Sequence, residues 1–167
     1  MRLVLKQTVS AWAVLGGIIL VSIVGVTSAN VGAFAIDRVA RLFGTHFPAL
    51  PGFEDYVRLA VSSAALMFLP YCQFQRGHIV VDLIGSKIPD RTKHILDSIS
   101  LIMTALLALF LAYWMTLGML ETRQDNALSR VLGWPEWPFY LPGIVSLYLW
   151  ALVSANQSFT PEDPADD

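Results

Sequence analysis

The chain has few charged residues and few of the side chains from which catalytic or metal sites are built. Of its 167 residues 14 % are charged, against about 25 % in soluble domains. It holds three histidines and a single cysteine, Cys72, so an intrachain disulfide is excluded and cysteine usage does not indicate a redox compartment. No glycine-rich phosphate loop and no His-x-x-x-His or Cys-x-x-Cys spacing occurs. We therefore expect no cofactor, no metal site and, since no basic stretch is interleaved with aromatics, no nucleic-acid partner.

Long uncharged runs take the place of the missing charges. Residues 9–36 contain no Asp, Glu, Lys or Arg over 28 positions, and about 20 apolar residues cross a bilayer. A cleaved signal peptide is the alternative for this run, but its apolar part exceeds the roughly 7–15 residues of a signal core. The pattern predicts an all-α integral membrane protein with four transmembrane helices, in a single domain over residues 1–155 and followed by a disordered acidic tail over 156–167. The expected spans are 9–36, 56–75, 92–120 and 137–155.

Shorter features are expected between and within these spans. Residues 36–43 have an amphipathic pattern and are predicted to lie along the membrane surface, and a second short interfacial helix is expected near 79–84. Pro70 lies inside the second span, where a proline kinks a helix or loosens one turn. Glu54 begins that span and lies four residues before Arg58, so the two can pair on one helix face.

The third predicted span carries small residues on one face and large apolar residues on the other. Small residues every four positions allow a neighbouring helix to approach closely, which decides packing in lipid more than apolar contact does. We therefore expect this small-residue stripe to face another protein helix; its members are Ser100, Thr104, Ala108, Ala112 and Thr116. The opposite surface suits lipid and includes Leu106, Leu109, Phe110 and Tyr113.

The central thirds of the spans contain no ionisable residue. A carrier or channel core usually needs ionisable groups or broken helices near the bilayer centre. Asn30 and Gln73 carry amide side chains near or within the spans. Asn30 is expected to bond to a neighbouring helix. The pattern thus favours an accessory or scaffolding subunit of a membrane complex over a carrier or an enzyme.

The orientation follows from a small difference in positive charge. Four spans place both termini on one side, and cations favour the cytoplasm. With the N-terminus inside, six cations lie on the inner side and five on the outer side, and the dense group between Arg76 and Lys93 favours this choice. We expect both termini to be cytoplasmic.

The stretch after the second span carries the most specific pattern. Arg76 ends an apolar run, Gly77 follows, and His78 and Asp82 lie four residues apart on an otherwise apolar segment. The stretch from Arg76 to Leu83 resembles the small membrane subunit, of the DctQ type, of the TRAP (tripartite ATP-independent periplasmic) transporters. Further matches are the Ile88-Pro89-Asp90-Arg91 step, the acid Glu54 at the head of the second span and the Trp/Pro-rich stretch 134–143. The resemblance covers about residues 5–155, with a departure at Pro70-Tyr71-Cys72, where relatives more often carry small residues.

The resemblance implies a role in a bacterial inner membrane, surrounded by lipid. A periplasmic solute-binding protein would deliver an organic acid, and a large multi-span TRAP membrane subunit would carry it inward by sodium symport. The small subunit would brace the large one and widen the docking surface. The family motif at the cytoplasmic edge would be Arg76, Gly77, His78, Asp82, Pro89 and Arg91. Two alternatives stay open: a subunit of another membrane complex, and a small membrane enzyme using His78 and Asp82 as an acid–base pair.

Overall fold

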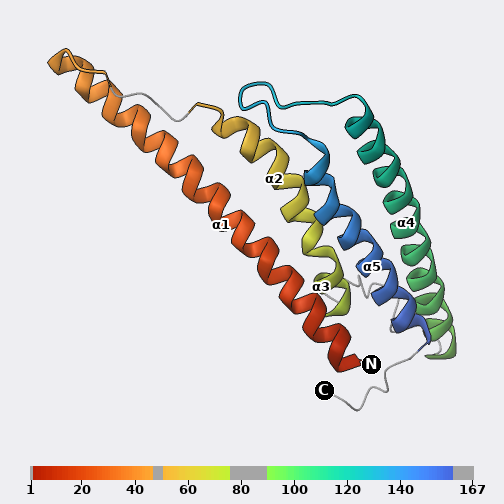
Figure 1. Ribbon diagram of the computed structural model, residues 1–167. Helices are drawn as coiled ribbons and strands as arrows, with labels where there is room; N and C mark the ends of the chain where they lie inside the picture. The colour runs from red at the N-terminus through yellow and green to blue at the C-terminus, as the bar shows by residue number, and fades with distance from the viewer. Residues whose placement is uncertain (1, 47–50, 76–89, 160–167) are drawn as a thin grey trace.

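The computed structural model describes residues 2–46, 51–75 and 90–159, with side chains from residue 3 and from residue 95 in the first and last ranges. All regular elements in these ranges are helical (Figure 1). Four stretches are long and apolar enough to cross a membrane: Leu3–Phe43, Phe53–Phe74, Ile95–Gln124 and Trp137–Phe159. The predicted all-α membrane protein with four spans is therefore confirmed. The elements are α1 (Arg2–Ala40), η1 (Arg41–Phe43), α2 (Phe53–Met67), α3 (Leu69–Phe74), α4 (Asp90–Gln124), η3 (Trp137–Tyr140) and α5 (Leu141–Phe159).

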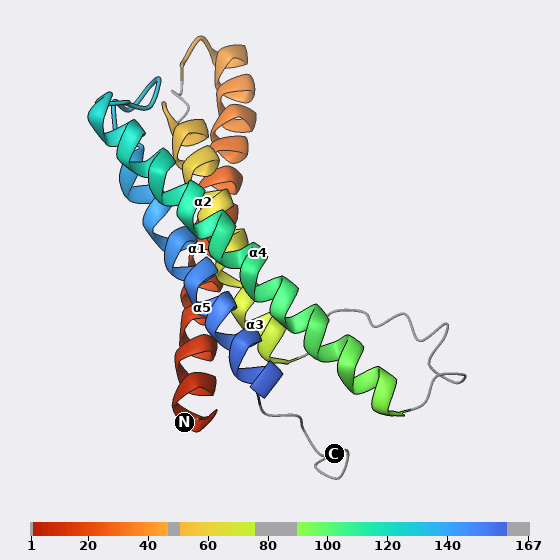
Figure 2. The same cartoon turned by 90° about the vertical axis from the view of Figure 1, so that its right-hand side faces the viewer.

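The helices form an open row and do not close into a ring. α1 packs against α2 and α3, these two pack against α5, and α5 packs along α4. α1 and α4 therefore lie at opposite edges of the row (Figures 1 and 2). The start of α1 and the end of α5 lie at one end of the helices, and the segments after α1 and after α4 lie at the other. We call the second end the loop end.

α1 is longer than a membrane is thick. Its uncharged part, residues 7–36, would span about 45 Å at 1.5 Å per residue, whereas the hydrocarbon core measures about 30 Å. α1 must therefore cross the membrane at a steep tilt or extend beyond the core.

The surface helix expected over residues 36–43 is not a separate element. α1 continues to Ala40, and η1 follows directly. The Asp37 carboxylate accepts a hydrogen bond from Arg41 Nε at 2.8 Å, which supports continued helix because residues four apart lie on one face. Gly44, with φ of 74°, then ends the helical stretch by donating its N–H to the Arg41 carbonyl.

Pro70 breaks the second span as predicted. α2 ends at Met67, Phe68 forms a turn, and α3 begins at Leu69. A proline has no N–H to donate to the carbonyl four residues earlier, which is that of Leu66, and its ring crowds that carbonyl. The chain accommodates this with a short second helix whose first turn contains Pro70.

The helix α5 reaches further than the sequence indicated. It continues to Phe159, so residues 156–159, expected to belong to a disordered tail, are helical. The reason is a side-chain cap across the helices, in which Gln157 Nε2 donates to the carbonyls of Gln73 at 3.1 Å and Phe74 at 3.3 Å. Both carbonyls lie in the last turn of α3, where groups from outside a helix commonly bond to its final carbonyls. The remaining part of the predicted tail, 160–167, lies outside the described residues.

The contact between α1 and α2 depends on a glycine. A Cβ atom added to Gly16 would lie 2.9 Å from the Met67 Cβ and 3.4 Å from the Ala64 carbonyl oxygen. Both atoms are fixed to the α2 backbone, so the neighbour cannot move aside by changing a rotamer. A Cβ at the adjacent Gly17 would meet nothing within 4 Å. Close approach of backbones at a small residue is the usual basis of helix association in lipid.

These two glycines give a matched pair of variants. We expect Gly16→Ala to lower the free energy of unfolding by about 1–3 kcal/mol, because α1 and α2 must separate to admit the methyl group. Gly17→Ala should be neutral or stabilising by up to about 1 kcal/mol, since alanine favours helix over glycine. Thermal unfolding of both variants in nanodiscs measures the difference, and equal midpoints would contradict the packing described.

Candidate functional site: a polar clamp at the loop end

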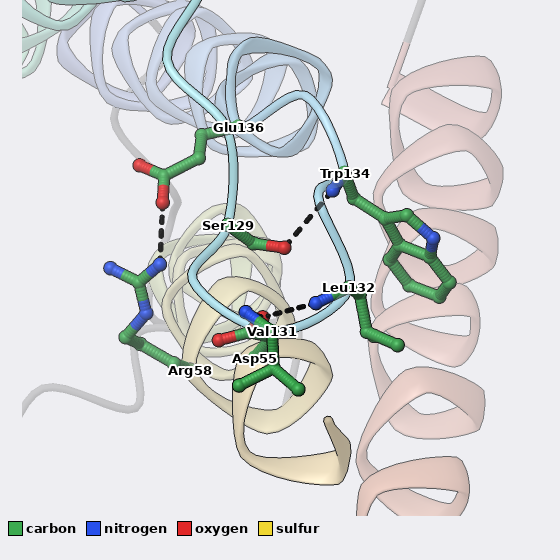
Figure 3. A network of polar contacts seen from close by, with 7 residues as sticks. All are labelled: Asp55, Arg58, Ser129, Val131, Leu132, Trp134 and Glu136. Atoms are coloured by element: carbon green, nitrogen blue, oxygen red, sulfur yellow. Dashed lines mark hydrogen bonds and ion pairs between the residues drawn. The ribbon is translucent and has the colours of Figure 1, made fainter. Parts of the chain in front are cut away.

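Asp55 is a buried carboxylate in the first turn of α2, only 4 % exposed. Its Oδ2 accepts hydrogen bonds from the backbone N–H groups of Val131 at 2.7 Å and Leu132 at 2.9 Å. Both donors belong to the loop between α4 and α5 (Figure 3). Bonds to an ionised acceptor are stronger than those between neutral groups, so Asp55 ties this loop to the start of α2.

The loop from α4 to α5 is also folded by its own bonds. Ser129 and Trp134 bond twice, through Ser129 N to the Trp134 carbonyl at 2.8 Å and through Trp134 N to Ser129 Oγ at 3.0 Å. Gly133 turns the chain between them with φ of 65°, a region that favours glycine. The loop is therefore a defined structure that Asp55 fixes in place.

Gly52 allows the loop to approach the start of α2. A Cβ atom there would lie 2.5 Å from Leu132 Cγ, and the φ of 78° at this position also favours glycine. Gly52 and Asp55 thus act on the same loop residue, the first by leaving room for its side chain and the second by binding its N–H.

Arg58, one turn further along α2, pairs with Glu136 and not with Glu54. Arg58 Nη2 lies 2.5 Å from Glu136 Oε1. Glu54 is exposed, and the acid that contacts other elements at the head of this helix is its neighbour Asp55. The sequence spacing allowed an i, i+4 pair, but Glu136, the residue just before η3, comes from a distant segment and pairs with Arg58. Beside it, Arg123 lies over the ring of Trp137 at 5.2 Å.

A second polar group lies at the other end of α5. Gln73 Oε1 accepts from Trp150 Nε1 at 3.1 Å, and Gln73 Nε2 donates to Gln157 Oε1 at 3.0 Å. Gln73 is buried, at 5 % exposure. Sequence reasoning singled out Gln73 but missed Gln157, because a glutamine at the end of an apolar run was assigned to the tail.

Further polar links join the helices between these two ends. Trp12 Nε1 donates to Ser146 Oγ at 2.8 Å, which connects α1 to α5. The hydroxyls of Ser22 and Tyr56 share a hydrogen bond between α1 and α2. Ser63 donates to the Phe139 carbonyl, which connects α2 to η3. Asn30 is buried, at 1 % exposure.

The stripe on α4 is divided in the structure. Ala108 and Ala112 are fully buried on the helix that packs along α5. Ser100, nearer the start of α4, is exposed. Thr104 and Thr116 bond to carbonyls of their own helix, those of Ser100 at 2.9 Å and Ala112 at 2.7 Å. The opposite, large-residue surface is exposed at Leu106, Leu109, Phe110 and Tyr113.

Most of the family motif lies outside the described residues. Arg76, Gly77, His78, Asp82 and Pro89 belong to this part of the chain, as does the interfacial helix expected at 79–84. Arg91 lies in the first turn of α4, without a described side chain. The motif's role therefore stays a prediction.

The described residues define a helical membrane protein whose polar groups hold helices and one loop together. Within residues 2–46, 51–75 and 90–159 no three His, Cys, Asp or Glu side chains gather as they would around a metal ion. The sequence matches the family model described as "Tripartite ATP-independent periplasmic transporters, DctQ component" over residues 30–161. The chain belongs to this family and is a small-subunit component of TRAP transporters. No curated protein and no solved structure matches it.

The Asp55 carboxylate and the N–H groups of Val131 and Leu132 form the clamp, and this contact predicts how the loop responds to loss of the carboxylate. Asp55→Ala leaves the N–H groups of Val131 and Leu132 without an acceptor, so these amides should exchange with deuterium at least roughly tenfold faster. Glu54→Ala removes an equally acidic but exposed side chain and should change nothing. Hydrogen–deuterium exchange on a peptide covering 128–136 distinguishes them; unchanged protection in Asp55→Ala would show that the loop does not depend on the clamp.

Proposed function

We propose that this chain is the bracing subunit of a TRAP transporter and does not itself bind the transported solute. In this role it holds the large multi-span subunit in the inner membrane of a bacterium. The large subunit carries an organic acid inward with sodium, after a periplasmic solute-binding protein has delivered it. The chain is accordingly a structural component of the transporter and not an enzyme.

The observation that carries the proposal is the open row of helices. The outer helices α1 and α4 expose long apolar surfaces, and Trp12, Gln73 and Trp150 form hydrogen bonds to other groups of this chain. Such a subunit offers wide lateral surfaces to lipid and to a larger partner. Membership of a tripartite transporter family supplies the kind of partner.

The two ends of the helices would have different tasks. With the termini cytoplasmic, as the positive charges favour, the loop end lies on the periplasmic side. The clamped loop then presents a fixed surface there, which includes the exposed side chains of Leu128, Val131 and Trp134. A fixed loop costs less entropy to dock than a mobile one, which suits contact with a soluble binding protein. The motif from Arg76 to Arg91 lies at the cytoplasmic edge in this orientation and organises assembly.

Co-purification of the two membrane subunits tests the proposal. The chain, expressed with the large subunit encoded in the same organism and extracted in mild detergent, should retain it. Retention of respiratory or other unrelated subunits in place of the large TRAP subunit would favour the alternative of a different complex.

The motif predicts a loss of assembly on a single substitution. Asp82→Ala should reduce the retained large subunit several-fold, because it removes the carboxylate of the family motif. Asp97→Ala is the control, since Asp97 is an exposed acid in the early part of α4 outside that motif. If Asp82→Ala retains the large subunit fully and supports normal solute uptake, the motif has no role in assembly.

A further inference from the structure

Three aromatic side chains with hydrogen-bonding groups are exposed on α4 and α5. Tyr113 and Trp114 of α4 are each 58 % exposed, and Tyr148 of α5 is 45 % exposed. Within the described residues, the Tyr113 hydroxyl, the Trp114 indole N–H and the Tyr148 hydroxyl have no hydrogen-bond partner. Tyr113 and Trp114 are in edge contact, with ring centroids 6.1 Å apart. We call these three residues the aromatic face.

The aromatic face lies deep in the membrane. Tyr148 is the central residue of the span Trp137–Phe159. The uncharged part of α4, residues 98–120, has its centre at Leu109, so Tyr113 lies about 6 Å from the centre along the helix. The half-thickness of the hydrocarbon core is about 15 Å. Helical side chains lean toward the helix N-terminus, which directs Tyr113 toward the bilayer centre and not toward the nearer interface.

Lipid tails offer no acceptor for these groups. A hydroxyl or N–H placed in hydrocarbon without a hydrogen bond is strongly unfavourable, and tyrosine and tryptophan are accordingly enriched at the interfaces. Three such groups elsewhere in the spans are hydrogen-bonded within the chain. Trp12 bonds to Ser146, Trp150 to Gln73 and Tyr56 to Ser22.

The opposite edge of the row, formed by α1, exposes side chains of a different chemical type. The outward side of α1 exposes aliphatic side chains and phenylalanine, at Val14, Leu15, Ile18, Val21, Val24, Val31 and Phe34. None of these side chains has a hydrogen-bonding group, so lipid covers them without cost. The two edges are therefore built for different surroundings.

We propose that the aromatic face is the docking surface for a transmembrane helix of the large subunit, one that presents hydrogen-bond acceptors at mid-membrane depth. This rests on the proposed function, since the partner is the large subunit of the same transporter. The outward surface of α1, with no such donors, faces lipid. The sequence alone assigned Tyr113 to a lipid surface; its exposed hydroxyl at this depth assigns it to a protein contact.

Site-directed photo-crosslinking tests this assignment in the assembled membrane complex. Benzoylphenylalanine placed at position 113 or 148 should give adducts with the large subunit, and the same group at Ile18 or Val21 of α1 should give none. Adducts from the α1 positions but not from 113 or 148 would overturn the inference while leaving the proposed function intact. Dimers of this chain, or lipid adducts alone, from 113 and 148 would overturn it as well. If the unsubstituted chain does not retain the large subunit, the proposed function itself is wrong.

A second measurement isolates the hydrogen bonds from the ring contacts. The triple variant Tyr113→Phe, Trp114→Phe and Tyr148→Phe keeps apolar rings but removes all three donors, and should weaken binding of the large subunit about tenfold. Its own thermal midpoint should be unchanged, because no described residue bonds to these groups. Phe110→Leu, on the same surface of α4, alters a ring without a donor and should leave binding near the original value. Unaltered affinity in the triple variant would contradict the proposal.

Discussion

Close contact around α5 is the constraint on which the rest of the structure depends. In a bilayer, apolar side chains gain little by leaving lipid for one another, so helices are joined where backbones approach closely and where polar groups pair. α5 has a close glycine contact with side chains of α2 and α4 and polar links to α1 and α3. A Cβ at Gly143 would lie 2.8 Å from a Leu66 carbon and 2.5 Å from a Met115 carbon, so this glycine lies close to α2 and α4. The polar links from Trp12 and Gln73 also end on α5.

This arrangement explains why the helices form a row. α5 has neighbours on two sides. α1 packs on α2 and α3, with a close contact at Gly16, and is linked to α5 by the hydrogen bond from Trp12 to Ser146. No comparable close contact joins α1 to α4 in the described residues, so both keep large outward surfaces. At the loop end Asp55 fixes the connection between α4 and α5 onto α2. The same subunit thus combines rigid internal joints with wide free edges, which suits a brace for a larger partner.

The sequence predicted the parts of the fold that local composition determines. Uncharged runs identified all four spans, and the missing N–H of Pro70 predicted the break that occurs at Phe68. The contacts between distant segments could not be predicted from the sequence. Arg58 was matched with Glu54 because their spacing was visible, whereas Glu136 comes from a segment 78 residues away. Asp55 and Gln157 were likewise missed, since neither differs in type or spacing from an ordinary helix-end residue.

The family motif identifies the family but does not show what its side chains do. Its pattern from Arg76 to Leu83 predicts the family, and the match over residues 30–161 confirms that prediction. A recognisable pattern does not reveal what its side chains contact, however, and that part of the chain lies outside the described residues. The role of the motif in assembly therefore stays a prediction, whereas the hydrogen bonds of Asp55 to the loop are seen directly.

Solute uptake into proteoliposomes tests the central claim, that this chain supports transport without handling the solute. Vesicles are prepared with this chain alone, with the large subunit alone, or with both, and the loaded binding protein and a sodium gradient are supplied. We expect no accumulation with this chain alone and sustained, sodium-dependent accumulation when both subunits are present. Accumulation of solute by vesicles that contain this chain alone would contradict the account.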